Sequence, residues 1–196
     1  MAIGVLALQG DYEAHAKALE KAGAEARLVR DAEGVAASDG LVIPGGESTT
    51  LWKLMEGTGI EDAIRDLART RPVFGTCAGA ILLAKDVTHP KRSGMGLLDA
   101  TVERNAYGRQ LDSTVVRLPD VDARVLGKQP LEAVFIRAPR LTRVGPSVEV
   151  LARRGPDPVL VRSGNVLAAT FHPELTDDRR VLDLFLAGVA RSRRAA

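Results

Sequence analysis

Short apolar runs alternate with helical patterns through the first half of the chain, and this alternation limits the fold more than any other feature. The first run, residues 3–8, has no charged side chain and ends at Gln9-Gly10. Such a run is typical of a strand buried on both faces of a parallel sheet. We therefore predict an α/β fold with an open, mostly parallel sheet flanked by helices. The runs are residues 3–8, 26–29, 40–43 and 72–75, and the helical segments are 12–22 (with Asp11 as its cap), 48–56, 60–69 and 80–84.

The second half of the chain consists of valine-rich segments that alternate in polarity and are separated by Gly, Pro and Asp. A period of two predicts half-buried strands, which we interpret as an antiparallel extension of the same domain. Residues 86–96 are the most loop-like interior stretch, and residues 178–190 predict a closing helix. Because neither a repeat nor a low-complexity linker is present, we predict one domain over residues 1–196. The valine-rich segments are 99–104, 113–117, 132–137, 148–153 and 158–170.

Composition narrows the class of protein. The 27 basic and 25 acidic residues give a formal net charge of +2, and the basic run at 191–194 suits the end of a helix better than a nucleic-acid contact. The single cysteine excludes an internal disulfide and a multi-cysteine metal site, so we expect neither metal nor cofactor. The sequence has no apolar stretch of about 18 residues and no recognisable signal peptide, so we expect a cytoplasmic protein without a membrane partner.

Gly75-Thr76-Cys77-Ala78-Gly79 places the single cysteine between an apolar strand and a helix. The glycines allow a sharp turn that presents a nucleophile at the carboxyl edge of the sheet, as in the G-x-S-x-G elbow. Amides at the start of the following helix favour a thiolate, and the Ala78 N–H is a natural oxyanion donor. A lone cysteine can also be a small buried apolar residue. The glycine spacing favours catalysis, with Cys77 as nucleophile.

A thiolate nucleophile needs a base and a group that orients the base. His172 follows the apolar strand 167–171 and opens His172-Pro173-Glu174. Because proline holds this tripeptide extended, the imidazole and the carboxylate should point to the same side, where Glu174 accepts the imidazole N–H. His15 lies inside an amphipathic helix, where a packed or exposed side chain is expected, and His89 lies in a polar loop. We predict a triad of Cys77, His172 and Glu174.

Pro44-Gly45-Gly46-Glu47-Ser48-Thr49-Thr50 follows another buried strand, so it lies at the same edge of the sheet, where α/β proteins bind ligands. The paired glycines let backbone amides approach a substrate oxygen, and we predict the Gly46 N–H as the second oxyanion donor. The segment can equally be a capped helix start with Ser48 or Thr49 as N-cap, and both interpretations can hold together. A phosphate-binding loop is not expected, because no Gly-Lys-Ser/Thr follows.

These segments, in this order and spacing, resemble those of the class I (triad) glutamine amidotransferases, which have a flavodoxin-like fold. Further motifs are similar to those of the glutaminase subunit of pyridoxal 5'-phosphate synthase, and the resemblance runs from Ile3 to about Phe185. The motifs are Ala7-Leu8-Gln9-Gly10-Asp11, Pro44-Gly45-Gly46-Glu47-Ser48-Thr49, Gly75-Thr76-Cys77-Ala78-Gly79, Val102-Glu103-Arg104-Asn105, Tyr107-Gly108-Arg109-Gln110, Phe135-Ile136-Arg137-Ala138-Pro139 and Phe171-His172-Pro173-Glu174.

The resemblance implies an enzyme that hydrolyses L-glutamine to L-glutamate and ammonia. The ammonia would pass to a synthase subunit, a (β/α)8 barrel in a hetero-oligomer, which makes pyridoxal 5'-phosphate from ribose 5-phosphate and glyceraldehyde 3-phosphate (vitamin B6 biosynthesis). An arginine fork and an acidic acceptor suit the two charged groups of glutamine. Without the resemblance, Arg104 and Arg137 would be ordinary surface arginines. The glutamine-binding residues implied are Gly46, Glu47, Ser48, Arg104, Ile136 and Arg137.

Three alternatives remain at this stage. A related cysteine hydrolase, such as a stress-response deglycase or protease, would carry an acidic residue where Gln9 stands. A catalytically silent binding subunit would not need the triad. An amidotransferase that feeds another acceptor, such as imidazole glycerol phosphate, would lack Glu47-Ser48-Thr49 and Ile136-Arg137. Gln9 is expected to touch the oxyanion segment or the partner, or to form a plain turn. Because a free glutaminase would waste glutamine, we expect its activity to depend on the partner.

Overall fold

The structure, a computed structural model, describes residues 1–104, 106 and 114–195. The helices are α1 (Tyr12–Lys21), α2 (Ala32–Ala36), α3 (Ser48–Met55), α4 (Ile60–Thr70), α5 (Ala78–Leu83), α6 (Ala123–Leu126), the 3-10 helix η1 (Pro173–Leu175) and α7 (Arg180–Ala195). The strands are β1 (Ala2–Leu6), β2 (Glu25–Val29), β3 (Gly40–Ile43), β4 (Val73–Thr76), β5 (Ala84–Thr88), β6 (Arg92–Ser93), β7 (Leu98–Glu103), β8 (Thr114–Leu118), β9 (Asp120–Val121), β10 (Leu131–Phe135), β11 (Arg140–Val144), β12 (Glu149–Arg154), β13 (Asp157–Ser163) and β14 (Val166–Ala169).

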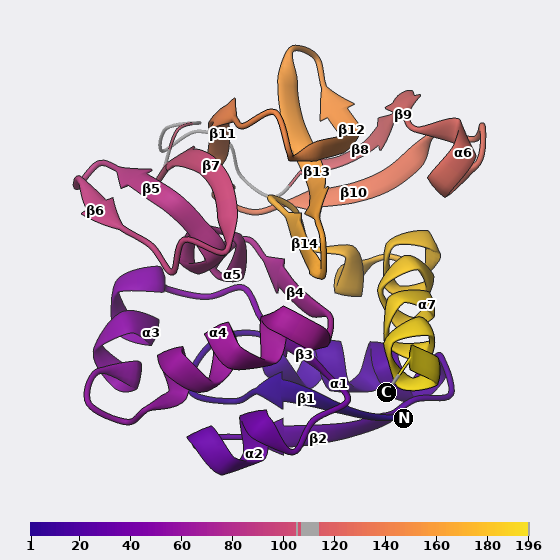
Figure 1. Ribbon diagram of the computed structural model, residues 1–196. Coiled ribbons are helices and arrows are strands. Elements are labelled where there is room, and N and C mark those ends of the chain that lie inside the picture. Colours follow the sequence, from indigo (N-terminus) through magenta and orange to yellow (C-terminus); the bar gives the residue numbers. More distant parts are fainter. Residues whose placement is uncertain (105, 107–113, 196) are drawn as a thin grey trace.

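The largest sheet has the strand order β2-β1-β3-β4-β14-β13-β12-β9. Its first five strands run parallel, and β13, β12 and β9 continue it in antiparallel pairing. Helices cover both faces of the parallel part, and two smaller sheets, β11-β7-β5-β6 and β10-β8, lie above it in the view of Figure 1. The predicted α/β fold, with a mostly parallel sheet and an antiparallel extension, is confirmed.

Side chains of the parallel strands enter two different hydrophobic cores, one on each face of the sheet. In β1, Ile3 and Val5 join the core formed with α1 and α7, whereas Leu6 joins the core formed with α2, α3, α4 and α5. Because successive side chains of a strand point to opposite faces, a strand covered on both sides needs apolar residues throughout. Each aliphatic side chain of this size contributes about 1.5–3 kcal/mol when it is fully buried.

Several boundaries differ from those predicted. The predicted loop 86–96 contains the end of β5 and all of β6, because Val87 is buried in a strand that pairs in parallel with β7. The predicted strand 158–170 is two strands, since Gly164 (φ +54) turns the chain between β13 and β14. Helix α7 begins at Arg180, whose N–H donates to Asp178, and continues to Ala195. None of the helices within the described ranges is long and apolar enough to cross a membrane.

Candidate active site

Cys77 occupies a strained turn between β4 and α5, with φ 47° and ψ −102°. A non-glycine residue adopts such a conformation only where the surrounding structure enforces it. The glycines on either side make room for the turn: a Cβ on Gly79 would lie 2.1 Å from the Ile43 carbonyl oxygen, and one on Gly75 would lie 2.6 Å from the Gly79 carbonyl carbon. The predicted elbow geometry is therefore present, and Cys77 is 8% exposed at its apex.

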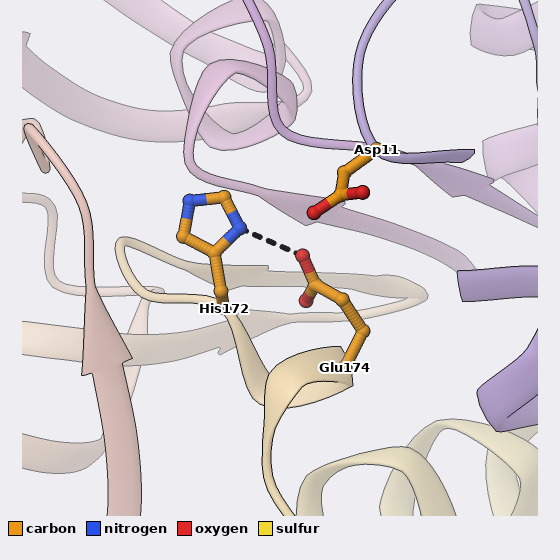
Figure 2. Close-up of side chains that lie close together, drawn as sticks. All are labelled: Asp11, His172 and Glu174. Carbon is orange, nitrogen blue, oxygen red and sulfur yellow. Dashed lines mark hydrogen bonds and ion pairs between the residues drawn. The ribbon is translucent and has the colours of Figure 1, made fainter. Parts of the chain in front are cut away.

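His172 and Glu174 come together directly after β14. His172 Nδ1 lies 2.7 Å from Glu174 Oε1, and their side chains are 7% and 1% exposed (Figure 2). The expected contact is present, but the reason given for it was wrong. Pro173 starts the 3-10 helix η1 instead of continuing an extended tripeptide, and this turn brings the carboxylate back to the ring. The backbone N–H of His172 donates to the Val134 carbonyl oxygen at 2.8 Å, which anchors this residue to β10.

The charges of this group favour an ionised His172 and Glu174. Burial lowers the pKa of His172, but its hydrogen bonds with Cys77 and Glu174 and the negative charges on both raise it to about 10. Burial raises the pKa of Glu174, but the charge and polar contact of His15, and then the charge and hydrogen bond of His172, lower it to about 2. A protonated imidazole beside the sulfur favours the thiolate form that nucleophilic attack requires.

A pocket of about 400 Å³ opens in front of Cys77 and His172. The predicted glutamine-binding residues all lie in its wall, although they come from separate segments of the chain. Ala78 and Glu174 are not among the residues that line this pocket. Ala78 is the first residue of α5 and is 1% exposed. The lining residues are Gln9, Gly10, Asp11, Gly45, Gly46, Glu47, Ser48, Cys77, Ile81, Arg104, Ile136, Arg137, Pro139 and His172.

The Pro-Gly-Gly segment closely approaches Cys77 and His172 of the predicted triad. A Cβ on Gly45 would lie 2.5 Å from His172 Cε1 and 3.4 Å from Cys77 Cβ, so only glycine fits there. The Glu47 N–H donates to Gln9 Oε1 at 2.8 Å, which is the contact between Gln9 and the oxyanion segment that the sequence left open. Gln9 therefore holds the segment that carries the predicted Gly46 donor.

Glu47, and not Ser48 or Thr49, caps helix α3. Its carboxylate accepts from the N–H groups of Thr49 (3.2 Å) and Thr50 (2.7 Å). Burial raises the pKa of Glu47, but these bonds to Thr50 and Thr49 outweigh burial and lower it. Glu47 Oε1 also pairs with Arg104 Nη2 at 3.0 Å. The two charges expected to recognise glutamine thus neutralise each other across the pocket.

Two side chains near the triad were not predicted to be there. The Asp11 carboxylate makes no capping hydrogen bond to a described residue and instead lies beside His172 and Glu174 (Figure 2). One carboxylate oxygen of Asp11, one ring nitrogen of His172 and one carboxylate oxygen of Glu174 all lie within 4.8 Å of one another. His15, one helical turn later, is buried and its Nε2 lies 3.3 Å from Glu174 Oε2. Asp11 and His15 are four residues apart, which places both side chains on the same side of α1. This spacing was the sequence signal that they lie together. The predicted motif residues Asn105 and Tyr107-Gly108-Arg109-Gln110 lie outside the described residues.

Comparison with known proteins decides the family. The SNO glutamine amidotransferase family matches residues 5–191 of the chain. This chain belongs to the SNO glutamine amidotransferase family. Among its relatives, the pyridoxal 5'-phosphate synthase subunit PdxT of Koribacter versatilis is 55% identical over 186 residues, which cover 95% of this chain and 94% of that protein. The PdxT subunit of Thermus thermophilus is 50% identical over 192 residues and is covered to 98%, against 95% of this chain.

Solved structures agree with this family. One crystal structure, described as a glutamine amidotransferase, has a TM-score of 0.88 and 48% identity, and the match covers 96% of this chain and 98% of that one. A putative GMP synthase component from Thermoplasma acidophilum, at 17% identity and a TM-score of 0.74, shares the fold (100% of this chain, 96% of that one). The resemblance predicted from the motifs is confirmed, and with it an enzyme of the amidotransferase class. The alternative of a deglycase or protease is excluded.

Proposed function

We propose that this amidotransferase hydrolyses L-glutamine to L-glutamate and ammonia, with Cys77, His172 and Glu174 as its triad, and supplies the ammonia to a pyridoxal 5'-phosphate synthase. The observation that carries the proposal is that Cys77 and His172 share one pocket with Glu47 and Arg104. A nucleophile and base therefore face the same space as a carboxylate and a guanidinium. The relatives named PdxT supply the acceptor: their names describe a subunit of pyridoxal 5'-phosphate synthase.

In the reaction that we propose, the Cys77 thiolate attacks the side-chain amide carbon of glutamine. The N–H groups of Gly46 and Ala78 stabilise the oxyanion. Protonated His172 gives its proton to the departing nitrogen, so ammonia leaves and a γ-glutamyl thioester remains. His172 then takes a proton from water, whose oxygen attacks the thioester and releases glutamate and the Cys77 thiolate. Glu174 keeps His172 in the required tautomer throughout.

Substrate binding would replace the contact between Glu47 and Arg104. The α-carboxylate of glutamine offers Arg104 a two-oxygen acceptor, and its α-ammonium offers Glu47 a donor. Each residue then keeps a partner of opposite charge. Gly46, Ser48, Ile136 and Arg137 complete the contacts that we assign to glutamine. The pocket volume of about 400 Å³ lies in the range of about 300–1,000 Å³ found for small-molecule sites.

The partner that we propose is the synthase subunit, a (β/α)8 barrel that binds this chain in a hetero-oligomer and converts ribose 5-phosphate and glyceraldehyde 3-phosphate to pyridoxal 5'-phosphate. A catalytically silent binding subunit is disfavoured, because such a subunit does not need a hydrogen-bonded His172–Glu174 pair and a cysteine at one pocket. We place the reaction in the cytoplasm, where a reactive thiol stays reduced.

The decisive experiment measures glutamate release with and without the synthase subunit. We expect release only, or mainly, in the mixture, and we expect Cys77→Ala to lower it by about a thousandfold or more. Arg124→Met serves as the control, because the Arg124 side chain on α6 is 86% exposed and is absent from the pocket wall. A fall in Cys77→Ala much smaller than this expected loss would refute the triad. Full activity of the isolated chain would refute the dependence on the partner.

A further inference from the structure

His15 is buried beside the triad, and the reaction described above gives it no part. It lies on the inner face of α1 and is 2% exposed. Its Nε2 atom lies 3.0 Å from Thr76 Oγ1 and 3.3 Å from Glu174 Oε2. Its ring and that of Phe74 form a T-shaped pair, with the centroids 6.5 Å apart and the planes at 88°. One nitrogen therefore contacts both the residue before the nucleophile and the acid of the triad.

The two oxygens of Glu174 have different partners. Oε1 accepts from His172 at 2.7 Å. Oε2 is buried and, among the described residues, has no partner that meets hydrogen-bond geometry, but His15 Nε2 lies within ion-pairing distance of it at 3.3 Å. A carboxylate oxygen removed from water is unfavourable unless a donor compensates it. A free second oxygen would also let the carboxylate rotate away from His172.

We propose that His15 is a positioning residue whose Nε2–H holds Glu174 Oε2, so that Oε1 stays on His172 and the triad becomes an ordered chain of four side chains. The inference rests on the triad proposed above. With its proton on Nε2, His15 shares one N–H between the Glu174 carboxylate and the Thr76 hydroxyl oxygen. It touches neither the pocket nor the substrate, since it is absent from the pocket wall as described.

Other charged groups lie on the elements around Glu174 and stay unchanged in every variant of the test. A carboxylate oxygen of Asp11 lies within 4.8 Å of a ring nitrogen of His172 and of a carboxylate oxygen of Glu174. A cavity of about 220 Å³ borders Glu174 and is lined by charged side chains of α1 and of the segment before α7, and β10 packs against η1. Because these groups are common to all variants, a difference between variants reports on His15. They are Asp11, Lys17, Lys21, Asp177, Arg179 and, on β10, Glu132.

The single cysteine gives a readout that needs neither substrate nor partner. Alkylation of Cys77 by iodoacetamide, followed against pH in the isolated chain, measures how much thiolate the His172–Glu174 pair supports. His15→Gln keeps an N–H near the Nε2 position, whereas His15→Asn is one methylene shorter and does not reach it. His15→Leu fills the ring volume without a donor. His89→Asn is the matched control, because the His89 side chain is 76% exposed and asparagine tolerates its left-handed backbone.

We expect His15→Asn and His15→Leu to move the midpoint of the alkylation profile up by about one pH unit. In the complex with the synthase subunit, we expect kcat to fall about tenfold while KM for glutamine stays near that of the wild type. His15→Gln and His89→Asn should keep the wild-type profile. The reason is that the carboxylate form of Glu174 is less stable without the His15 donor. It then stabilises the His172 imidazolium, and through it the Cys77 thiolate, less well.

Three results would overturn the inference: unshifted profiles in both the asparagine and leucine variants, a glutamine variant that shifts as far as they do, or the same shift in Thr76→Val. The last would mean that the contact with Thr76 is the one that matters. Thermal melts identify any variant that does not fold, and the leucine variant then decides in place of asparagine. Activity that survives Cys77→Ala would refute the proposed triad itself, whereas unaffected His15 variants beside an inactive Cys77→Ala refute this inference alone.

Discussion

At the scale of single residues, the pair between Arg104 and Glu47 is the clearest target in the pocket. Arg104 is 14% exposed and its Nη2 lies 3.0 Å from Glu47 Oε1. If Arg104 binds the α-carboxylate of glutamine, Arg104→Met should lower kcat/KM by about 10- to 100-fold, mainly through KM. Steady-state glutaminase kinetics with the synthase subunit measure this effect. A variant with unchanged KM would show that another group, such as Arg137, holds the carboxylate.

The His172–Glu174 pair also makes stability depend on pH. Glu174 has its pKa lowered from 4.5 to about 2, so it stabilises the fold above pH 4.5 and loses this effect as pH falls toward 2. His172 has its pKa raised from 6.5 to about 10, so its stabilisation is complete below pH 6.5 and is lost as pH rises toward 10. The contribution of the pair is therefore largest between pH 4.5 and 6.5.

His172→Gln should lower the free energy of unfolding relative to the wild type, and this difference should become smaller as pH rises from 6.5 to 10. Glu174→Gln should also lower the free energy of unfolding, and its difference from the wild type should become smaller as pH falls from 4.5 to 2. Urea denaturation at several pH values, followed by the fluorescence of Trp52, measures the free energy of unfolding for each variant. Curves that run parallel to the wild type over both ranges would contradict the opposite pKa shifts of the two residues.

At the scale of elements, the elbow between β4 and α5 depends on close backbone approach. A Cβ at position 79 would lie 2.1 Å from the Ile43 carbonyl oxygen, so Gly79→Ala must push α5 away from β3. We expect a loss of about 3 kcal/mol in the free energy of unfolding. In the control Gly188→Ala, the nearest contact is Pro72 Cγ at 3.4 Å and the helix gains about 1 kcal/mol from the better helix former. Chemical denaturation compares the two, and equal stabilities would contradict the packing argument.

The elements that sequence patterns missed are the ones with few buried side chains. In β5 only Ala84 and Val87 are fully buried, so the strand lacks the apolar run that marks β3 or β4. Its pairing with β7 supplies the order instead. Strand β14 was expected within the antiparallel extension, but it pairs in parallel with β4 and so delivers His172 beside Cys77. This pairing joins strands far apart in the chain, so local sequence patterns do not reveal it.

At the scale of the molecule, the two hydrophobic cores share the same sheet. Trp52 lies in the core of α2 to α5, whereas Phe185 lies in the core of α1 and α7. Since β1, β3 and β4 contribute to both, neither core can form without the sheet. We expect residues 1–196 to unfold as the single domain predicted from sequence, with coincident urea transitions by far-UV circular dichroism and by the fluorescence of the single tryptophan. Two separated transitions would contradict a single domain.

The sequence by itself determined the class of fold and the candidate residues of the site. Apolar runs, glycine spacing around Cys77 and the His172-Pro173-Glu174 tripeptide are local patterns, and local backbone chemistry is enough to interpret them. Only the tertiary structure decided that Glu47 pairs with Arg104, that Gly45 wedges against His172, and that His15 faces the second oxygen of Glu174. These contacts join segments far apart in the chain, and their geometry depends on how the helices pack on the sheet. His15 shows the limit best: its helical position allowed either a packed or an exposed ring, and only packing against β4 and η1 decided that the ring is buried and has partners.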